Sequence, residues 1–141
     1  MERSKKILIL KIVVIAIACF IVFSLVMMII SLSLTSALLL PVENQLELLK
    51  KGEIEAAYNL TSEKFKEKVG REDFEEFLKA NPLLTSEHKR TFGQRIVQDE
   101  AGLVDGVLTD EKGNRLFIEY NLLKEEGIWK IIYFRVSVNP L

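Results

Sequence analysis

The chain has 141 residues, of which 19 are basic and 20 acidic, and its formal net charge is −1. Four of the basic residues but only one acidic residue precede residue 41, so 15 basic and 19 acidic residues remain from there on. This mildly acidic composition argues against nucleic acid as a partner and against strong adhesion to anionic lipid. Cys19 is the single cysteine, which excludes disulfides and thiolate metal sites from the rest of the chain.

An uncharged run covers residues 12–40, and Arg3, Lys5, Lys6 and Lys11 precede it. A bilayer core of about 30 Å requires roughly 20 apolar residues in a helix, so the run predicts one transmembrane helix within residues 1–40. Positively charged flanks stay in the cytoplasm. We therefore expect a single-pass signal-anchor in the cell membrane, with a cytoplasmic N-terminus and residues 41–141 outside the cytoplasm.

Two other interpretations of this segment remain open. Thr35-Ser36-Ala37 is an acceptable cleavage triplet for a secretory signal, although the apolar region is longer than the roughly 7–15 residues of such signals. Ala16-Ile17-Ala18-Cys19 resembles a bacterial lipoprotein box, but an apolar run would then begin the mature chain. The uncleaved anchor fits the length of the run best.

Residues 41–141 suffice for one modest domain. Pro41 suits the first turn of a new helix, and Val42, Leu46 and Leu49 then form an apolar stripe that Gly52 ends. Further short helical patterns follow before Asn81-Pro82. They carry Ile54, Ala57 and Tyr58, then Phe65 and Val69 behind a Thr61 or Ser62 cap, then Phe74, Phe77 and Leu78.

From Lys89 the apolar period changes to two, which predicts four strands joined by short turns. In the first, Phe92, Gln94 and Ile96 alternate with Thr91, Arg95 and Val97. The second predicted strand is Leu103–Thr109. The third shows a clear alternation of apolar residues at Leu116, Ile118, Tyr120 and Leu122. The last strand, Ile128 to Val138, carries Trp129, Ile131 and Tyr133 on one face and Ile132, Phe134 and Val136 on the other. Either a central position or cover from a second subunit or the anchor side explains its two apolar faces.

Helices followed by an antiparallel meander predict an α+β domain, in which about three helices pack on a four-stranded sheet to form a cone. Residues 45–84 and 106–136 resemble the nuclear-transport-factor-two-like superfamily, which includes the SnoaL and ketosteroid-isomerase-like folds. The shared elements are Gly52, Ala56-Ala57-Tyr58, Phe74-Glu75-Glu76-Phe77 and Gly127-Ile128-Trp129-Lys130-Ile131. The resemblance implies a cone-shaped domain of a membrane-anchored, uncharacterised type with a pocket between sheet and long helix. It implies no single activity.

Isomerases and dehydratases of that fold use a carboxylate base in an apolar pocket with hydroxyl groups nearby. By this resemblance the carboxylates Asp105 and Glu119 and the hydroxyls of Tyr58 and Tyr120 are candidate pocket groups. Trp129 and Tyr133 are either stacking residues for a ligand or part of the core. Asp105 faces the pocket if Leu103 and Val107 do, and faces solvent if Val104 and Leu108 form the inner face. His88, the only histidine, is expected in an exposed loop, without a partner for a zinc site.

No catalytic residue, metal site or cofactor is assigned from these patterns. We expect a non-enzymatic binding or assembly module of the cell envelope, whose partners are the lipid bilayer and a second copy, a membrane-complex partner or a small apolar ligand. The alternatives are a pocket enzyme acting on a small apolar substrate and a module that dimerises through its sheet.

Overall fold

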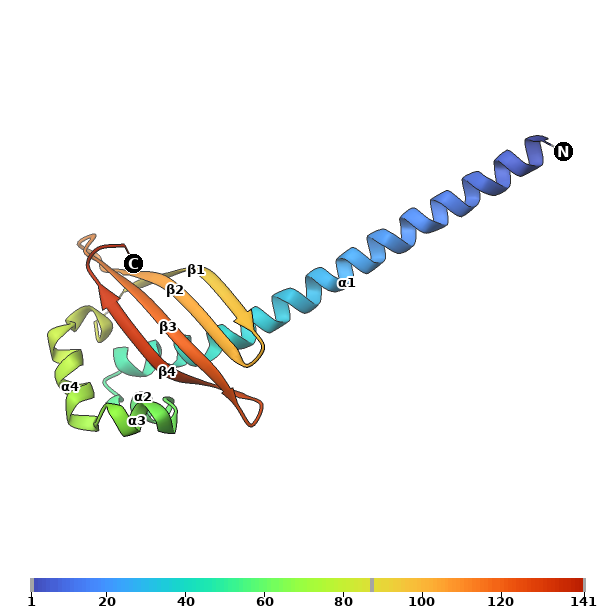
Figure 1. Cartoon of the computed structure of the whole chain (residues 1–141). Helices are drawn as coiled ribbons and strands as arrows, with labels where there is room; N and C mark the ends of the chain where they lie inside the picture. Colours follow the sequence, from blue (N-terminus) through green and yellow to red (C-terminus); the bar gives the residue numbers. More distant parts are fainter. Residues whose placement is uncertain (1, 87, 141) are drawn as a thin grey trace. The chain divides into compact units, whose positions relative to one another are not determined.

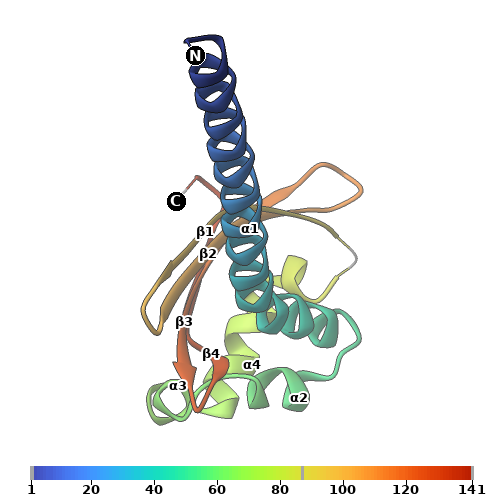
Figure 2. The same ribbon diagram turned by 90° about the vertical axis from the view of Figure 1, so that its right-hand side faces the viewer.

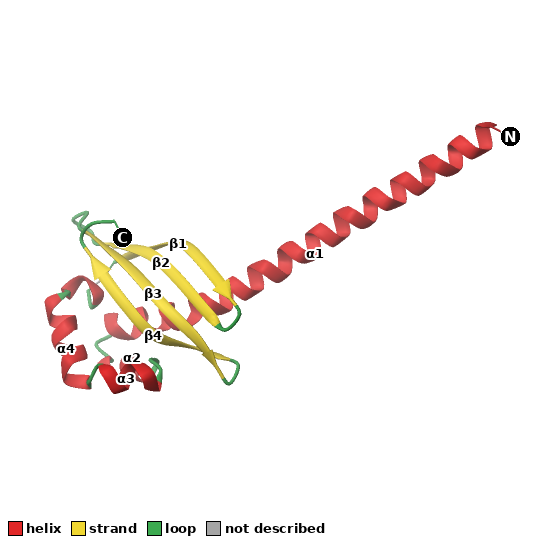
Figure 3. Cartoon of the chain, viewed as in Figure 1, coloured by secondary structure: helices red, strands yellow, loops and turns green. Residues whose placement is uncertain are grey.

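The computed structural model describes residues 2–86 and 88–140, and the side chains of all of these except Glu2 and residues 31–35. It contains two compact units, Met1–Leu34 and Thr35–Leu141. Helices and antiparallel strands make up the second unit, which confirms the α+β class (Figures 1 and 3). Its elements in chain order are the end of α1 (Glu2–Lys50), α2 (Ile54–Asn59), α3 (Glu63–Lys68), α4 (Arg71–Ala80), a 3₁₀ turn (Pro82–Leu84), β1 (Lys89–Gln98), β2 (Ala101–Thr109), β3 (Arg115–Glu125) and β4 (Ile128–Ser137).

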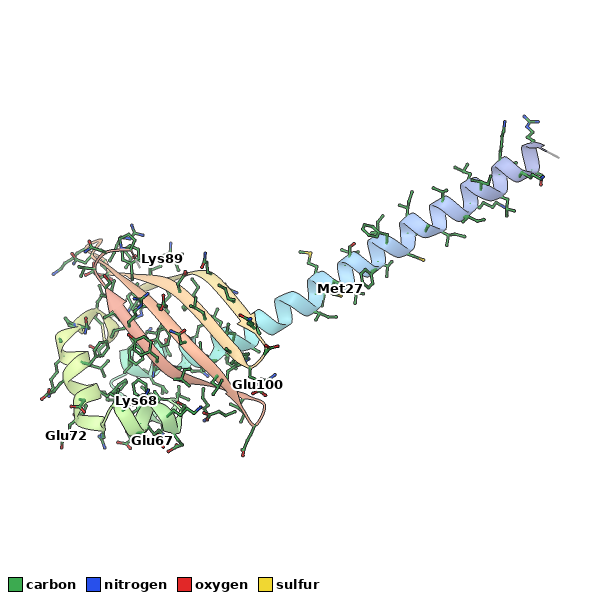
Figure 4. All side chains as sticks on the ribbon, in the orientation of Figure 1. Met27, Glu67, Lys68, Glu72, Lys89 and Glu100 are labelled. Carbon is green, nitrogen blue, oxygen red and sulfur yellow. The ribbon has the colours of Figure 1, made fainter. Side chains whose placement is uncertain are left out.

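The first unit is the apolar part of α1. Arg3–Ile30 is long and apolar enough to cross a membrane, as the sequence predicts. Its large apolar side chains are exposed along the helix, among them Phe20 at 71 %, and Figure 4 shows the Met27 side chain projecting outward. A helix that is apolar all round and unburied in its own chain requires an apolar environment.

Helix α1 continues through Pro41, so the prediction that a new helix begins there is wrong. Proline has no N–H and deprives the carbonyl of Ala37 of its helical donor. Ala37 is exposed, and water can hydrate that carbonyl. Leu38, Val42 and Leu46 are fully buried on the other side of the helix, and their packing favours an unbroken helix despite the lost hydrogen bond.

The four strands form a meander in the order β1-β2-β3-β4, with every neighbouring pair antiparallel. Figure 2 shows α2, α3 and α4 gathered on one side of the curved sheet. Tight turns join the strands: Asp99 and Glu126 adopt positive φ, and Gly127 follows Glu126 at φ 80°. Such backbone angles suit two-residue hairpins, whose twist matches that of the strands.

The inner face of the sheet is filled by apolar side chains that pack against the helices. Val104, Tyr120 and Phe134 lie opposite one another across three strands, and so do Gly102, Leu122 and Ile131. Val104 and Leu108 are fully buried and form the inner face of β2. Asp105 therefore lies on the outer face, away from the helices. The core also contains Leu49, Ala57, Phe65, Phe74, Leu78, Leu84, Leu116 and Ile118.

A β-bulge in β1 overturns the predicted alternation of that strand. Phe92 faces inward and pairs with Gly106, whereas Arg95 pairs with Val104. Two residues of β1, Gly93 and Gln94, therefore lie opposite the single residue Asp105. An inserted residue moves every following side chain to the opposite face. Ile96 is consequently 50 % exposed, whereas Val97 packs against the core.

A second irregularity does the same in β4. Asn121 pairs with Tyr133 but Leu122 pairs with Ile131, which leaves Ile132 as the extra residue. The predicted grouping of Tyr133 with Trp129 and Ile131 is therefore wrong: Ile131 is buried, and Tyr133 is 51 % exposed. Moreover, β4 lies at the edge of the described sheet, so a central position does not explain its apolar character.

Gly102 marks the closest approach of the sheet to α1. A Cβ atom at this position would overlap the side chain of Leu38, which is fully buried. Gly102 thus allows β2 and the beginning of the buried part of α1 to pack without a gap.

We predict that Gly102→Ala destabilises the domain by about 1–2 kcal/mol, because overpacking a core contact outweighs the gain from a less flexible unfolded chain. The midpoint of thermal unfolding, followed by circular dichroism of the full-length protein in detergent, should fall by roughly 5 °C. Ala101→Val, at the neighbouring exposed position, serves as the control and should change the midpoint little. An unchanged midpoint in Gly102→Ala would refute this account of the contact.

Candidate functional site

Six aromatic rings form a continuous cluster between β4 and helices α3 and α4. Phe134 stacks on Tyr120, with ring centroids 5.1 Å apart and planes at 10°, and Phe77 meets Phe134 edge-on at 5.3 Å. Phe65 and Phe74 complete the contacts to Phe134, and Tyr58 packs on both. Such ring pairs contribute about 0.5–1.5 kcal/mol each beyond their buried area. The cluster fixes α3 and α4 against the sheet edge.

Tyr120 occupies the centre of this interior rather than the wall of an open pocket. It is fully buried, and its hydroxyl has no hydrogen-bond partner among the described residues. Burial raises the pKa of Tyr120 far above that of a free phenol, because the apolar surroundings disfavour the phenolate. A neutral hydroxyl without a partner costs stability and offers no route for a proton.

Gln45 is a second polar group in the core, and the sequence analysis missed it. The side chain is fully buried on α1; Nε2 donates to the carbonyl of Ala57 at 3.1 Å, and Oε1 has no partner among the described residues. Its hydrogen bond ties α1 to α2. The apolar spacing of Val42, Leu46 and Leu49 places position 45 on the same helix face, which was the available signal.

Tyr58 and Asp105 make local structural contacts. The Tyr58 hydroxyl donates to the carbonyl of Val69 at 2.8 Å, which ties α2 to the end of α3. Asp105 lies on the outer face of the sheet, where its Oδ1 accepts from the backbone N–H of Gln94 at 2.8 Å inside the β1 bulge. A Cβ atom on Gly93 would collide with that carboxylate, so Gly93 and Asp105 together accommodate the bulge.

Tyr133 and Trp129 line two different surface pockets. Tyr133 borders an apolar pocket of about 260 Å³ over the aromatic cluster, with Val69 of the loop after α3 and Asp73 of α4 also at its wall. Trp129 borders a pocket of about 320 Å³ beside α1, together with Leu40, Pro41 and Ile128. These five candidate residues thus do not line one pocket: Tyr58 and Tyr120 lie in the interior, and the other three face separate surfaces.

A polar network connects α1 to the beginning of β1. Arg90 donates to Glu47 at 2.9 Å and, through Nε, to Nε2 of His88 at 3.2 Å. His88 Nδ1 lies 2.8 Å from the carbonyl of Ser86, so the neutral tautomer with its proton on Nδ1 satisfies both contacts. The hydrogen bond from Arg90 lowers the pKa of Glu47. His88 thus lies in the loop before β1, as expected, but is half-buried and engaged rather than exposed.

The outer face of the sheet carries a charged row between two partly apolar rows. Arg135 donates to both carboxylate oxygens of Glu119, at 3.1 and 2.9 Å, beside Asp105 on the next strand. Val107 and Phe117 flank this row on one side, and Leu103 and Tyr133 on the other. This face is a curved, mixed surface that the described part of the chain leaves open.

Residues 37–139 match the family described as Domain of unknown function (DUF4864). The chain belongs to this family. The match covers more than half of the chain and begins just after the first compact unit ends. No curated protein matches the chain.

We predict that Tyr120→Phe stabilises the domain by about 1 kcal/mol, because it removes a buried hydroxyl without a partner and keeps the stacked ring. Burial raises the pKa of Tyr120 in the folded state. Titration of Tyr120 therefore leaves the free energy of unfolding unchanged below about pH 10, where free tyrosine titrates. The free energy of unfolding falls as the pH rises from there toward the folded-state pKa, because unfolding then releases the phenolic proton. Denaturant unfolding of full-length protein at neutral and alkaline pH should show Tyr120→Phe losing less stability than wild type above that pH.

Tyr58→Phe provides the matched control, since it removes the same atom from a hydroxyl that donates to Val69. It should lower stability by about 1 kcal/mol. If both variants are destabilised alike, the Tyr120 hydroxyl has a partner and our account of the interior is wrong.

Proposed function

We propose that this DUF4864 protein is a membrane-anchored, non-enzymatic binding or assembly module of the cell envelope, with its domain outside the cytoplasm. The observation that carries the proposal is a domain whose core, among the residues whose burial is described, contains no charged side chain and which directly follows a helix able to cross a membrane. Recognition by such a domain uses its surface and takes place next to the bilayer.

The anchor supports the membrane location. The basic residues Arg3, Lys5 and Lys6 precede the apolar helix, and positively charged flanks favour the cytoplasmic side. The helix is too long for the apolar region of a typical cleaved signal, and only a few residues separate it from the buried part of α1.

The interior argues against a pocket enzyme. Among the residues whose burial the structure describes, the buried polar ones are Gln45, Thr61 and Ser62, and none of them carries a charge. A general base requires a titratable group within reach of a substrate. Asp105 holds the β1 bulge on the outer face, and Tyr120 is sealed in the core.

We also infer that the family is a branch of the nuclear-transport-factor-two-like superfamily. The meander sheet, the helices on one of its faces and the positions of Gly52 and Trp129 support this relationship.

Labelling with a membrane-impermeant thiol reagent tests the topology, because Cys19 is the only cysteine. In a Cys19→Ser background, Glu111→Cys in the exposed β2–β3 turn should react in intact cells. Ser4→Cys should react only after lysis. The opposite pattern would contradict the proposed orientation. Intact mass of the purified protein should include residues 1–36, whereas a mass beginning near Ala37 would identify a cleaved signal instead.

Self-association through the sheet is a second candidate, favoured by the exposed Tyr133 on the edge strand β4 and the partly exposed Phe117 on β3. Native mass spectrometry of the full-length protein, released from detergent micelles, should give a dimer. Phe117→Glu should shift the mass to the monomer, and Glu67→Lys at an exposed position of α3 should not. A monomeric wild type at every protein concentration would exclude this candidate and leave recognition of a different partner.

A further inference from the structure

The pocket beside Trp129 is an open groove between two elements of the second unit, and we call it the helix–hairpin groove. One wall is the face of α1 that carries Ala37, Leu40, Pro41 and Asn44. The other wall is the β3–β4 hairpin, Gly127 to Lys130, and Leu60 closes the end. Its volume of about 320 Å³ lies at the lower end of the range of ligand-binding pockets.

The helix wall faces away from the domain core. Residues 37, 40, 41 and 44 follow the i, i+3, i+4, i+7 spacing of one helix face, whereas Leu38 and Val42 are buried against the sheet. Leu40 is 58 % exposed. The carbonyl of Ala37, which Pro41 deprives of its helical donor, belongs to this same wall. The wall therefore offers apolar surface with a few polar groups.

The hairpin wall has the composition of a membrane-interface anchor. Ile128 is 60 % exposed, and the ammonium group of Lys124 lies 5.9 Å from the centroid of the Trp129 ring. Tryptophan is enriched at the level of the lipid headgroups, and lysine buries its apolar stem while its charge reaches the phosphates. Lys130 also lines the groove.

The groove lies within reach of the lipid headgroups, if the proposed anchoring is correct. Ala37 is seven residues beyond Ile30, the end of the membrane-spanning stretch, and even a fully extended chain covers at most about 25 Å in that distance. The proposed anchoring thus keeps lipid within about 25 Å of this groove.

We propose that the helix–hairpin groove binds a phospholipid of the adjacent leaflet. Leu40, Ile128 and Trp129 contact the beginning of its acyl chains, and Lys130 and Lys124 contact its phosphate. Glu125 and Glu126 in the same hairpin balance the two lysines. Binding therefore relies on apolar contact and on the phosphate common to phospholipids, and does not require an anionic headgroup. This inference rests on the proposed membrane anchoring.

Trp129 is the only tryptophan in the chain, so its fluorescence reports directly on the groove. The full-length protein is reconstituted into zwitterionic vesicles whose lipids carry bromine either near the headgroup or near the end of the acyl chain. We expect strong quenching of Trp129 by bromine near the headgroup and weak quenching by bromine at the chain end. Vesicles with a fraction of anionic lipid should give the same pattern.

Leu40→Asn and Ile128→Asn should each reduce the quenching, because they remove the apolar walls. Ile96→Asn is the matched control: it alters an isoleucine of similar exposure, on the outer face of β1, and should leave the quenching unchanged. A second control moves the reporter, with Trp129→Phe combined with Tyr133→Trp. This probe lies about 13 Å farther along β4 and should be quenched much less.

The outcomes separate the two proposals. If the protein stays with salt-washed vesicles but bromine near the headgroup leaves Trp129 unquenched, the groove does not hold lipid and the anchor still stands. If quenching falls as the protein-to-lipid ratio rises, another protein chain occupies the groove, which also overturns the lipid inference. If salt removes the protein from the vesicles, the membrane anchoring fails, and the lipid inference fails with it.

Discussion

The packing of one stripe of α1 on the inner face of the sheet determines the rest of this domain. Leu38, Val42, Leu46 and Leu49 are all fully buried there. Burying four aliphatic side chains contributes roughly 6–12 kcal/mol before conformational entropy is subtracted, which is comparable to the net stability of a whole domain. The stripe therefore explains why α1 remains helical through Pro41 and why β2 has glycine at position 102.

A filled interior limits the chemistry that the domain can perform. Two buried polar atoms, the Tyr120 hydroxyl and Gln45 Oε1, have no hydrogen-bond partner among the described residues, and no charged side chain is buried among the residues whose burial is described. The charged side chains are on the outside, where Glu119 pairs with Arg135 and Glu47 with Arg90. Exposed pairs of this kind contribute little to stability but give a surface a defined charge pattern, which is useful for recognition.

The sequence was sufficient for the class of fold because its periodic signals are long. The alternation in β3 correctly placed Leu116, Ile118, Tyr120 and Leu122 on one face, and the stripe from Val42 to Leu49 is buried as predicted. The failures in β1 and β4 have one physical cause. A bulge adds a single residue, which a period-two pattern cannot reveal, and it reversed the faces of Ile96 and Tyr133. Gly93, inside the bulge of β1, was the only local signal, since glycine within a strand often marks such a site.

The same reversal separated Tyr133 from Trp129, because a site predicted from strand faces depends on every register being regular. The remaining candidate site is the helix–hairpin groove, where proximity to the proposed membrane anchor compensates for weak contacts. A short tether raises the effective concentration of neighbouring groups to the order of millimolar. A groove with a dissociation constant of about 1 mM, or roughly −4 kcal/mol, would then be occupied for much of the time. A small groove such as that beside Trp129 therefore suffices for a stable contact at a membrane, although the same groove would scarcely bind a ligand free in solution.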